Sequence, residues 1–464
     1  MQLTAPSKIS VGFVSLGCPK NLVDAQYMAD VLRADGFTLA PAPETADVAI
    51  INTCAFIGPA REEALAALRT ATGWKKQGPC RAVIATGCLP QRRAAETAAL
   101  LPEVDAWLGV DGLDEIARVV RKALAGEHGR IEITPQATRL FNPKSSGVIF
   151  SSGAYAYLKI AEGCNHACGF CAIPLIRGRQ RSRPVAEIVR EAESRLAAGM
   201  RELTLIAQDV TSYGRDLGAP QPDLCTLLRE LEGLGGKFWI RLLYGYPSRV
   251  SPELLELMAG SSRICAYLDI PIQHSHPEIL RAMRRADSIE AVADLAPRLR
   301  RHIPNITLRT TCLVGFPGET EAHFQHLLDY TREAAFDHLG VFPYSSEAGT
   351  AAHGLQPAVP AHVAEARQHR LMQAQQAIVT HKLQQRIGTI DEILLEKNLS
   401  PEDNIWVGRS RREAPQIDNV VFITGLPGQA RPGDFINVEY TDVDGYDMWA
   451  QPAGPDMQKQ AEGC

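Results

Sequence analysis

Three closely spaced cysteines form the most informative pattern in the sequence. Cys164, Cys168 and Cys171, called the loop triplet below, have the spacing C-x3-C-x2-C and follow the apolar run AYAYLKIA. Thiolates on one short loop can bind neighbouring corners of a single four-iron cluster. A ferredoxin would supply a fourth cysteine a few residues later, but the next cysteine here is Cys225. We therefore expect a cluster with three protein ligands, whose fourth iron is open to a substrate.

Two simpler interpretations of this loop remain open. Structural zinc normally takes a closed set of four protein ligands. The only nearby candidate, His166, lies inside the loop, where it would not easily complete a tetrahedron with its neighbours. The other interpretation is three unrelated buried thiols. The spacing favours an iron–sulfur cluster over both.

A second set of cysteines is spread over the first part of the chain. Between residues 8 and 125, short apolar runs alternate with helical patterns, which predicts a parallel sheet covered by helices. Three predicted strands, ISVGFVSLGC, TADVAIINTC and CRAVIATGC, end in Cys18, Cys54 and Cys88, called the strand-end triplet below. Right-handed crossovers place the carboxyl ends of such strands along one edge, where open sheets bind ligands. We expect a second cluster site there and exclude Cys80, which precedes its strand; the alternative is that small buried cysteines end strands by chance.

Length, charge and composition set the broad class. The chain has 464 residues, a formal net charge of −5 and eleven cysteines. This length suits two to four domains, and the charge carries no overall nucleic-acid signature. No apolar run approaches the ~20 residues of a membrane span, and the first residues lack the pattern of a secretory signal. The cysteines therefore indicate metal or catalytic thiols rather than a disulfide framework, and we expect a cytoplasmic location.

Changes of pattern divide this mixed α/β chain into domains. The α/β domain over 8–125 is followed by a linker over 126–152, with several Gly, Pro and Ser residues. Residues 153–384 contain six strand–helix units, which predicts a partial (β/α)6 barrel with its functional residues at the carboxyl ends of the strands. Residues 385–452 contain short strands, among them NIWVGRSRREAP, and predict a small all-β barrel of the oligonucleotide-binding kind. Residues 453–464 are interpreted as a tail.

The cysteine motifs resemble those of a known family. C-x3-C-x2-C after a strand, with Phe170 before the last cysteine, resembles the radical S-adenosylmethionine (radical SAM) enzymes. LGCPKN, INTC and TGC ahead of that loop resemble the methylthiotransferases, which carry a second [4Fe–4S] cluster and end in a TRAM domain. The resemblance covers essentially the whole chain. It implies that the loop triplet holds the cluster that cleaves S-adenosylmethionine to a 5′-deoxyadenosyl radical, and that the strand-end triplet holds an auxiliary cluster carrying the sulfur to be transferred.

Residues at the carboxyl ends of the predicted barrel strands are candidates for contacts with S-adenosylmethionine or the substrate. Tyr244, Tyr246 and Gln273 lie at such ends, and so does His274, which we interpret as a hydrogen-bonded structural residue. The glycines of GFPGE would let the backbone approach an adenosine closely. The residues that we predict to contact S-adenosylmethionine or the substrate are Gln208, Asp209, Gly315, Pro317, Gly318 and Glu319.

Four arginines follow the loop triplet at alternate positions, and their role is open. They could bind a substrate carboxylate or could simply form a solvated surface. The sequence favours neither interpretation. The four are Arg177, Arg179, Arg181 and Arg183.

The charge of the third domain bears on the partner. Residues 386–450 carry six basic residues against twelve acidic ones, hence −6. Binding to RNA phosphates requires basic surface, so we expect a basic protein partner, and direct tRNA binding is disfavoured. LGCPKN, AQDVTSYG, YLDIPIQH and VGRSRREAPQIDN resemble the RimO-type branch, which modifies an aspartate of the small-subunit ribosomal protein S-twelve. The tRNA-modifying branch usually has Gln-Met after its first cysteine.

One functional hypothesis and two rivals follow. The resemblance implies transfer of a methylthio group to the β-carbon of that aspartate by a monomeric enzyme with an external electron donor. Two molecules of S-adenosylmethionine would serve as methyl donor and radical source. The first rival is the same chemistry on a tRNA adenosine. The second is a non-catalytic iron–sulfur protein that binds RNA or transfers electrons, and the open-iron spacing argues against it.

Overall fold

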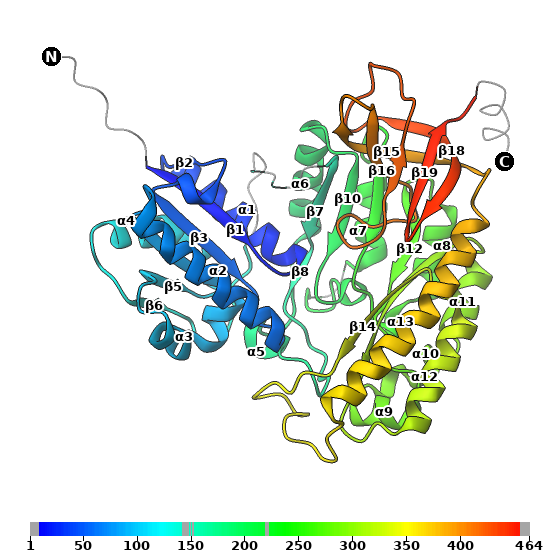
Figure 1. Ribbon diagram of the computed structural model, residues 1–464, viewed down its shortest axis with the longest axis horizontal. Coiled ribbons are helices and arrows are strands. Elements are labelled where there is room, and N and C mark those ends of the chain that lie inside the picture. Colours follow the sequence, from blue (N-terminus) through cyan, green and yellow to red (C-terminus); the bar gives the residue numbers. More distant parts are fainter. Residues whose placement is uncertain (1–8, 142–147, 149, 151–152, 219–221, 455–464) are drawn as a thin grey trace.

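The computed structural model describes residues 9–141, 148, 150, 153–218 and 222–454. In Figure 1 the first domain lies to the left of the central barrel, and the third domain lies at the upper right, against the top of that barrel. Residues 455–464 of the proposed tail, and residues 142–147, 149 and 151–152 of the proposed linker, lie outside the described residues. Over the described ranges, the helices are too short or too polar to cross a lipid bilayer.

The first domain is a parallel sheet with helices on both faces, as predicted. Its strand order is β2-β1-β3-β4-β5-β6, and all neighbouring strands are parallel. Helices α1 (Pro19–Ala34) and α4 (Ile116–Leu124) pack on one face, and α2 (Gly58–Gln77) and α3 (Cys88–Leu100) pack on the other. The strands are β1 Ser10–Ser15, β2 Thr38–Leu39, β3 Val48–Thr53, β4 Ala82–Gly87, β5 Ala106–Leu108 and β6 Arg130–Glu132.

The predicted boundary between this domain and the linker is wrong. Residues assigned to the linker form β6, the sixth strand of the sheet, which pairs in parallel with β5. Ala137 and Phe141 are also buried, and Phe141 belongs to the core beneath α1 and α4. A strand of three residues joins the sheet through backbone hydrogen bonds, so it leaves no hydrophobic period in the sequence.

The central domain is the predicted open barrel of six parallel strands. The strands pair in sequence order, β7-β10-β11-β12-β13-β14, as successive right-handed units do. Alternate side chains such as Leu203 and Leu205 face the outer helices and form the largest hydrophobic core. The strands are β7 Tyr155–Lys159, β10 Glu202–Ile206, β11 Trp239–Leu242, β12 Ile264–Asp269, β13 Thr307–Val314 and β14 His338–Pro343, with a small hairpin of β8 Ala161–Glu162 and β9 Arg181–Ser182.

Helices cover the outside of this barrel, as Figure 1 shows. The segment between β12 and β13 contains three helices, whereas a simple strand–helix unit would contain one. The barrel helices are α5 Ile173–Arg177, α6 Val185–Ala197, α7 Leu224–Glu232, α8 Pro252–Gly260, α9 Pro277–Ala282, α10 Ile289–Ala293, α11 Leu295–His302, α12 Glu321–Ala334 and α13 Ala361–Gln384.

The third domain is a closed barrel of five strands, in agreement with the predicted all-β fold. Its strand order is β15-β16-β17-β19-β18. The strand predicted for NIWVGRSRREAP ends early, because β16 stops at Arg409 and residues 410–418 form a loop. The strands are β15 Ile390–Ser400, β16 Ile405–Arg409, β17 Val421–Ile423, β18 Phe435–Asp444 and β19 Asp447–Pro452.

This loop, residues 410–418, covers the inner side chains of the central barrel. The Tyr157 hydroxyl donates a hydrogen bond to the Pro415 carbonyl over 3.0 Å, and the Tyr267 hydroxyl donates one to the Asp418 carboxylate over 2.7 Å. Next to the loop, Arg409 of β16 is buried and forms an ion pair of 2.8 Å with Glu202 of β10. The second and third domains therefore share a buried polar interface.

Candidate active site between the first domain and the barrel

All six cysteines of the two triplets line one pocket between the first domain and the barrel. The pocket has a volume of about 430 Å³, and the six residues meet there from opposite walls. Cys80 is buried just before β4, at the amino end of that strand, as expected, and does not line the pocket. The described cysteines form no disulfide.

The strand-end triplet is assembled by parallel strands in register. Cys18 and Cys88 follow β1 and β4 and start α1 and α3, whereas Cys54 directly follows β3. The Asn21 side-chain amide donates hydrogen bonds to the Leu16 carbonyl over 2.9 Å and to the Thr53 carbonyl over 3.0 Å. Asn21 thereby joins the ends of β1 and β3.

Glycine is required next to two of these cysteines. Gly17 has a φ of +88°, and a Cβ there would lie 2.8 Å from the Cys54 Cβ. Gly87 has a φ of +96°, and a Cβ there would lie 2.4 Å from the Asn52 Oδ1. L-residues rarely adopt this conformation, and the contacts leave no space for a side chain. The three strand ends therefore approach one another only because these two positions are glycines.

The loop triplet lies on one segment anchored to the barrel at both ends. The Cys164 N–H donates to the Gly178 carbonyl over 3.1 Å, and the Gly169 N–H donates to the Met283 carbonyl over 2.8 Å. Gly163, just before the triplet, has a φ of +80° and would clash with backbone if it carried a Cβ. The loop is thus fixed in place by backbone contacts on either side.

Burial makes three of the thiols in these triplets poor candidates for free thiolates. Burial raises the pKa of Cys88 to about 12 and the pKa of Cys171 to about 12, and it raises the pKa of Cys164 to about 11. A thiol that binds a metal ion loses its proton, because the metal stabilises the thiolate form. Three clustered sulfurs in each wall fit an iron–sulfur cluster better than they fit a nucleophile.

A buried network of charges joins the two walls. Arg177, at the end of α5 in the barrel, forms an ion pair of 2.7 Å with Asp24 of α1 and donates a hydrogen bond to the Cys88 sulfur over 3.4 Å. Lys159 of β7 pairs with Glu162 over 2.7 Å, and Arg177 also reaches Glu162, over 3.0 Å. Burial alone would raise the pKa of Glu162, but the charges of Arg177 and Lys159 outweigh it and hold that pKa well below its usual range. Glu162 therefore remains charged inside the interface.

The arginine run does not act as a unit, because it divides between buried and exposed side chains. Arg177 and Arg183 are buried, and Arg183 pairs with Glu191 over 2.7 Å, so both are structural. Arg179 is exposed and Arg181 is half-buried. Their different burial follows from their different local structures, because Arg177 ends α5 whereas Arg181 lies in β9.

Two of the predicted contact residues, Gln208 and Asp209, line the pocket. The Gln208 amide donates to Glu162 over 2.8 Å, whereas its Oε1 is buried without a hydrogen-bond partner among the described residues. The Asp209 carboxylate is occupied by His166, over 2.6 Å, and by the hydroxyl of Ser212. Gln208 is therefore free to accept a hydrogen bond from a ligand, and Asp209 fixes the cysteine loop through His166.

The aromatic and amide candidates at the next strand ends also reach the pocket. Tyr244, Tyr246 and Gln273 line it, and the Tyr246 ring stacks on the His166 ring with 3.7 Å between their centroids. Tyr244 and Gln273 both have positive φ angles, +68° and +69°, although neither is glycine. Strained backbone of this kind concentrates at functional sites. His274 is fully buried and does not line the pocket, which agrees with its interpretation as a structural residue.

The structure does not bring the candidates of the GFPGE turn to this pocket. Gly315 and Pro317 line a different cavity of about 300 Å³, against α13, and a Cβ at Gly315 would meet Ala364. The Glu319 carboxylate is buried and accepts hydrogen bonds from the Gly315 and Phe316 N–H groups, and a Cβ at Gly318 would meet open space. The turn after β13 bends toward α13, away from the cysteine pocket. These residues therefore shape that turn.

The sequence interpretation missed two cations in the pocket. Lys20 is 7% exposed, and its Nζ lies 3.1 Å from the centroid of the Tyr244 ring. Burial lowers the pKa of Lys20 to about 8 against the opposing charges of Cys18 and Asp269. Arg285 donates to the Cys168 sulfur over 3.5 Å and lies over the Tyr246 ring. Lys20 belongs to the LGCPKN motif, so its position next to Cys18 was the available signal.

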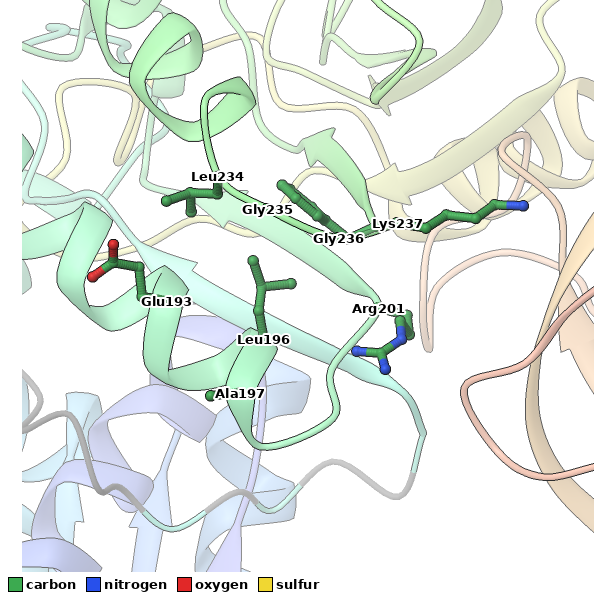
Figure 2. A pocket seen from close by; sticks show the side chains of 9 residues that line it. Glu193, Leu196, Ala197, Arg201, Leu234, Gly235, Gly236 and Lys237 are labelled. Atoms are coloured by element: carbon green, nitrogen blue, oxygen red, sulfur yellow. The ribbon is translucent and has the colours of Figure 1, made fainter.

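Another cavity, shown in Figure 2, has no such chemistry. It has a volume of about 530 Å³ and lies between the end of α6 and the segment that leads into β11. Its lining includes Glu193, Arg201 and Lys237, near the amino ends of the barrel strands. Active sites of β/α barrels lie at the carboxyl ends, so the cysteine pocket is the candidate site.

Comparison with known proteins agrees with this geometry. Residues 158–331 match the model of the radical SAM superfamily, residues 10–109 match the uncharacterized protein family UPF0004, and residues 387–452 match the TRAM domain. A solved structure of the radical S-adenosylmethionine methyltransferase TsrM from Kitasatospora setae shares the fold, with a TM-score of 0.52 and 15% identity over 72% of this chain and 75% of that one. The fold and the cysteine pocket define a radical SAM enzyme, and members of this class use a [4Fe–4S] cluster and S-adenosylmethionine.

Curated relatives give the family within that class. A protein from Syntrophus aciditrophicus named "Ribosomal protein uS12 methylthiotransferase RimO" is 45% identical over 449 residues, which cover 95% of this chain and 98% of the relative. A protein of the same name from Geobacter sulfurreducens is 41% identical over 443 residues, with 95% and 98% covered. This chain belongs to the RimO family of methylthiotransferases.

Proposed function

We propose that this protein transfers a methylthio group to the β-carbon of an aspartate in ribosomal protein uS12. The observation that carries the proposal is the meeting of two cysteine triplets in one pocket, each on a separate domain. One triplet alone would suit an ordinary radical SAM enzyme. An enzyme that also delivers sulfur needs a second site close to the activated carbon. The strand-end triplet in the facing wall provides that site.

We assign the loop triplet to the cluster that binds S-adenosylmethionine, and the strand-end triplet to an auxiliary cluster. When bound, these clusters supply the electron that cleaves S-adenosylmethionine and the sulfur that is transferred. Arg285 and Arg177 donate hydrogen bonds to cysteine sulfurs of the two triplets, which offsets negative charge on those thiolates. The free Oε1 of Gln208 is placed to accept a hydrogen bond from the ligand's amino or hydroxyl groups.

Apolar side chains keep the pocket dry around these groups. Phe56 and Ile57 line it from the first domain, and Phe170, Ile173 and Ile176 line it from the barrel. Exclusion of water protects a reactive intermediate from side reactions. This lining therefore suits radical chemistry better than simple electron transfer.

The third domain supports a protein substrate over tRNA. The third domain carries a charge of −6, and several of its few cations are already engaged by other groups of the protein. Arg409 pairs with Glu202 over 2.8 Å, Arg386 pairs with Glu413 over 2.9 Å, and Arg411 donates to the Ser262 carbonyl over 2.7 Å. Cations used in this way are not available to phosphates, whereas the surface acids suit a basic ribosomal protein. We further propose that the protein acts as a monomer with an external electron donor.

The test is a direct competition between substrates. Anaerobically reconstituted full-length protein is incubated with S-adenosylmethionine, a strong reductant, a sulfide source, and either purified uS12 or bulk tRNA. Mass spectrometry should find the added methylthio mass on an aspartate of uS12 and not on tRNA. Modification of tRNA, or S-adenosylmethionine cleavage with uS12 left unmodified, would contradict the proposal.

A further inference from the structure

Among the buried cations at the interface between the first domain and the barrel, Lys20 differs from Lys159 and Arg177 in its partners. Lys159 and Arg177 are each paired with Asp24 and Glu162. Lys20 is also more than nine-tenths buried and lines the pocket between the two triplets. Within the described residues, Lys20 forms no hydrogen bond or ion pair. Its close contact is the face of the Tyr244 ring, 3.1 Å from Nζ.

The nearest carboxylates are already engaged elsewhere. Asp269 forms an ion pair of 3.0 Å with Arg309 and accepts a hydrogen bond from the Tyr244 N–H over 3.2 Å. Glu162 is held by Lys159, Arg177 and Gln208. A cation–π contact leaves the three N–H donors of an ammonium group without conventional acceptors. Burial of a cation without an anionic partner is unfavourable, so this arrangement is suited to an anion that arrives with the substrate.

The position of Lys20 agrees with that role. It lies in the first turn of α1, next to Cys18 of the strand-end triplet, and its partner Tyr244 ends the third barrel strand. The amino end of α1, a helix of 16 residues, faces the same pocket and favours negative charge there. An anion bound at Lys20 would therefore lie between the two cysteine triplets.

We propose that the Lys20 ammonium binds the side-chain carboxylate of the target residue and so selects an acidic side chain as substrate. The inference rests on the proposed function, because the carboxylate is that of the aspartate in uS12. A carboxylate bound here presents its own β-carbon, one bond away, to the space between the triplets. Lys20 thus acts as a specificity-determining residue.

The experiment compares aspartate with asparagine at the target position. Mass spectrometry of the product made by the unaltered enzyme first locates the modified aspartate, which is then replaced by asparagine in a second uS12. Equilibrium binding of both forms is measured with anaerobically reconstituted full-length enzyme, its Lys20→Met and Lys20→Arg variants, and Lys397→Met. Lys397 is an exposed lysine of the third domain, so its variant has the same change in charge away from the pocket.

The unaltered enzyme and Lys397→Met should bind the aspartate form about 10- to 100-fold more tightly than the asparagine form, the effect of one charge-assisted hydrogen bond. Lys20→Met should bind both forms equally, and Lys20→Arg should keep part of the preference. Iron content should be the same in all four proteins. An undiminished aspartate preference in Lys20→Met would overturn the inference. So would loss of about four irons from that variant, since Lys20 would then be a counter-ion of the cluster. If the unaltered enzyme does not modify uS12 at all, the proposed function fails instead.

Discussion

The two cysteine triplets reach the same pocket by different routes. The loop triplet lies within one segment, so its three ligands move together and are fixed by backbone contacts to Gly178 and Met283. The strand-end triplet depends on the register of three parallel strands and on glycines between them. A compact loop can be recognised from spacing alone, whereas a dispersed site exists only if the whole domain folds. The second site is therefore the more sensitive one to changes in packing.

The largest effect is expected from the loop triplet. Cys171→Ala should abolish 5′-deoxyadenosine formation, a loss of at least about a thousand-fold, because S-adenosylmethionine cleavage requires the cluster at that loop. The iron content should fall by about four per chain if each triplet holds one four-iron cluster. Chromatography of the quenched reaction measures the nucleoside. Continued 5′-deoxyadenosine formation would remove the assigned role of the loop triplet.

Substitution in the strand-end triplet should separate the two halves of the reaction. Cys88→Ala should lose methylthio product and about four irons while it still forms 5′-deoxyadenosine, because the loop triplet is intact. Cys80→Ala is the matched control, since Cys80 is another buried cysteine of the same domain outside the pocket. It should keep its iron and its product. Equal iron loss in both variants would show that the strand-end triplet is not a distinct site.

The next largest effect is expected from the buried charge network between the first domain and the barrel, which should contribute to the free energy of unfolding. Arg177→Met leaves Asp24 and Glu162 with less compensation inside the interface, which costs about 3–5 kcal/mol when a buried pair is broken. The free energy of unfolding, measured by urea denaturation of the apoprotein, should fall accordingly. Arg229→Ala removes an ion pair whose side chains are both about half exposed, with Glu253 as partner, and should change stability by less than about 1 kcal/mol. Similar losses in both variants would be inconsistent with a buried network.

The smallest effect tests the glycine that the dispersed site requires. Gly87→Ala forces a side chain into a left-handed backbone conformation and against Asn52, at a cost of about 1–3 kcal/mol. Thermal denaturation should show a lower midpoint, and the strand-end site should bind less iron. Gly73→Ala lies within α2 with open space around it and should raise stability by about 0.5–1 kcal/mol. A Gly87→Ala protein that is more stable than the unaltered one would show that a side chain fits at this position.

Much of this fold follows from sequence patterns. The β/α alternation predicted both parallel sheets and the sheet edges at which the two cysteine triplets lie. The cysteines after β1, β3 and β4 were placed correctly because strand direction decides which sheet edge a residue occupies. The all-β third domain was likewise visible in its turns.

What the sequence could not supply depends on how the domains dock. The sequence left the role of Arg177 open between a carboxylate site and a solvated surface, and only its contacts with Asp24 and Cys88 in the other domain show that it is buried. The GFPGE turn was expected at the pocket, but its backbone follows α13 instead. Local periodicity says nothing about such contacts, because they join segments far apart in the chain.

The loop at residues 410–418 has a practical consequence for experiments on the third domain. Because Tyr157 and Tyr267 donate hydrogen bonds to this loop, deleting the domain would expose side chains that are now buried inside the barrel. A truncated enzyme that loses activity would therefore reveal a damaged scaffold, not a missing docking arm. Point changes on the acidic outer surface are the better way to ask what this domain recognises.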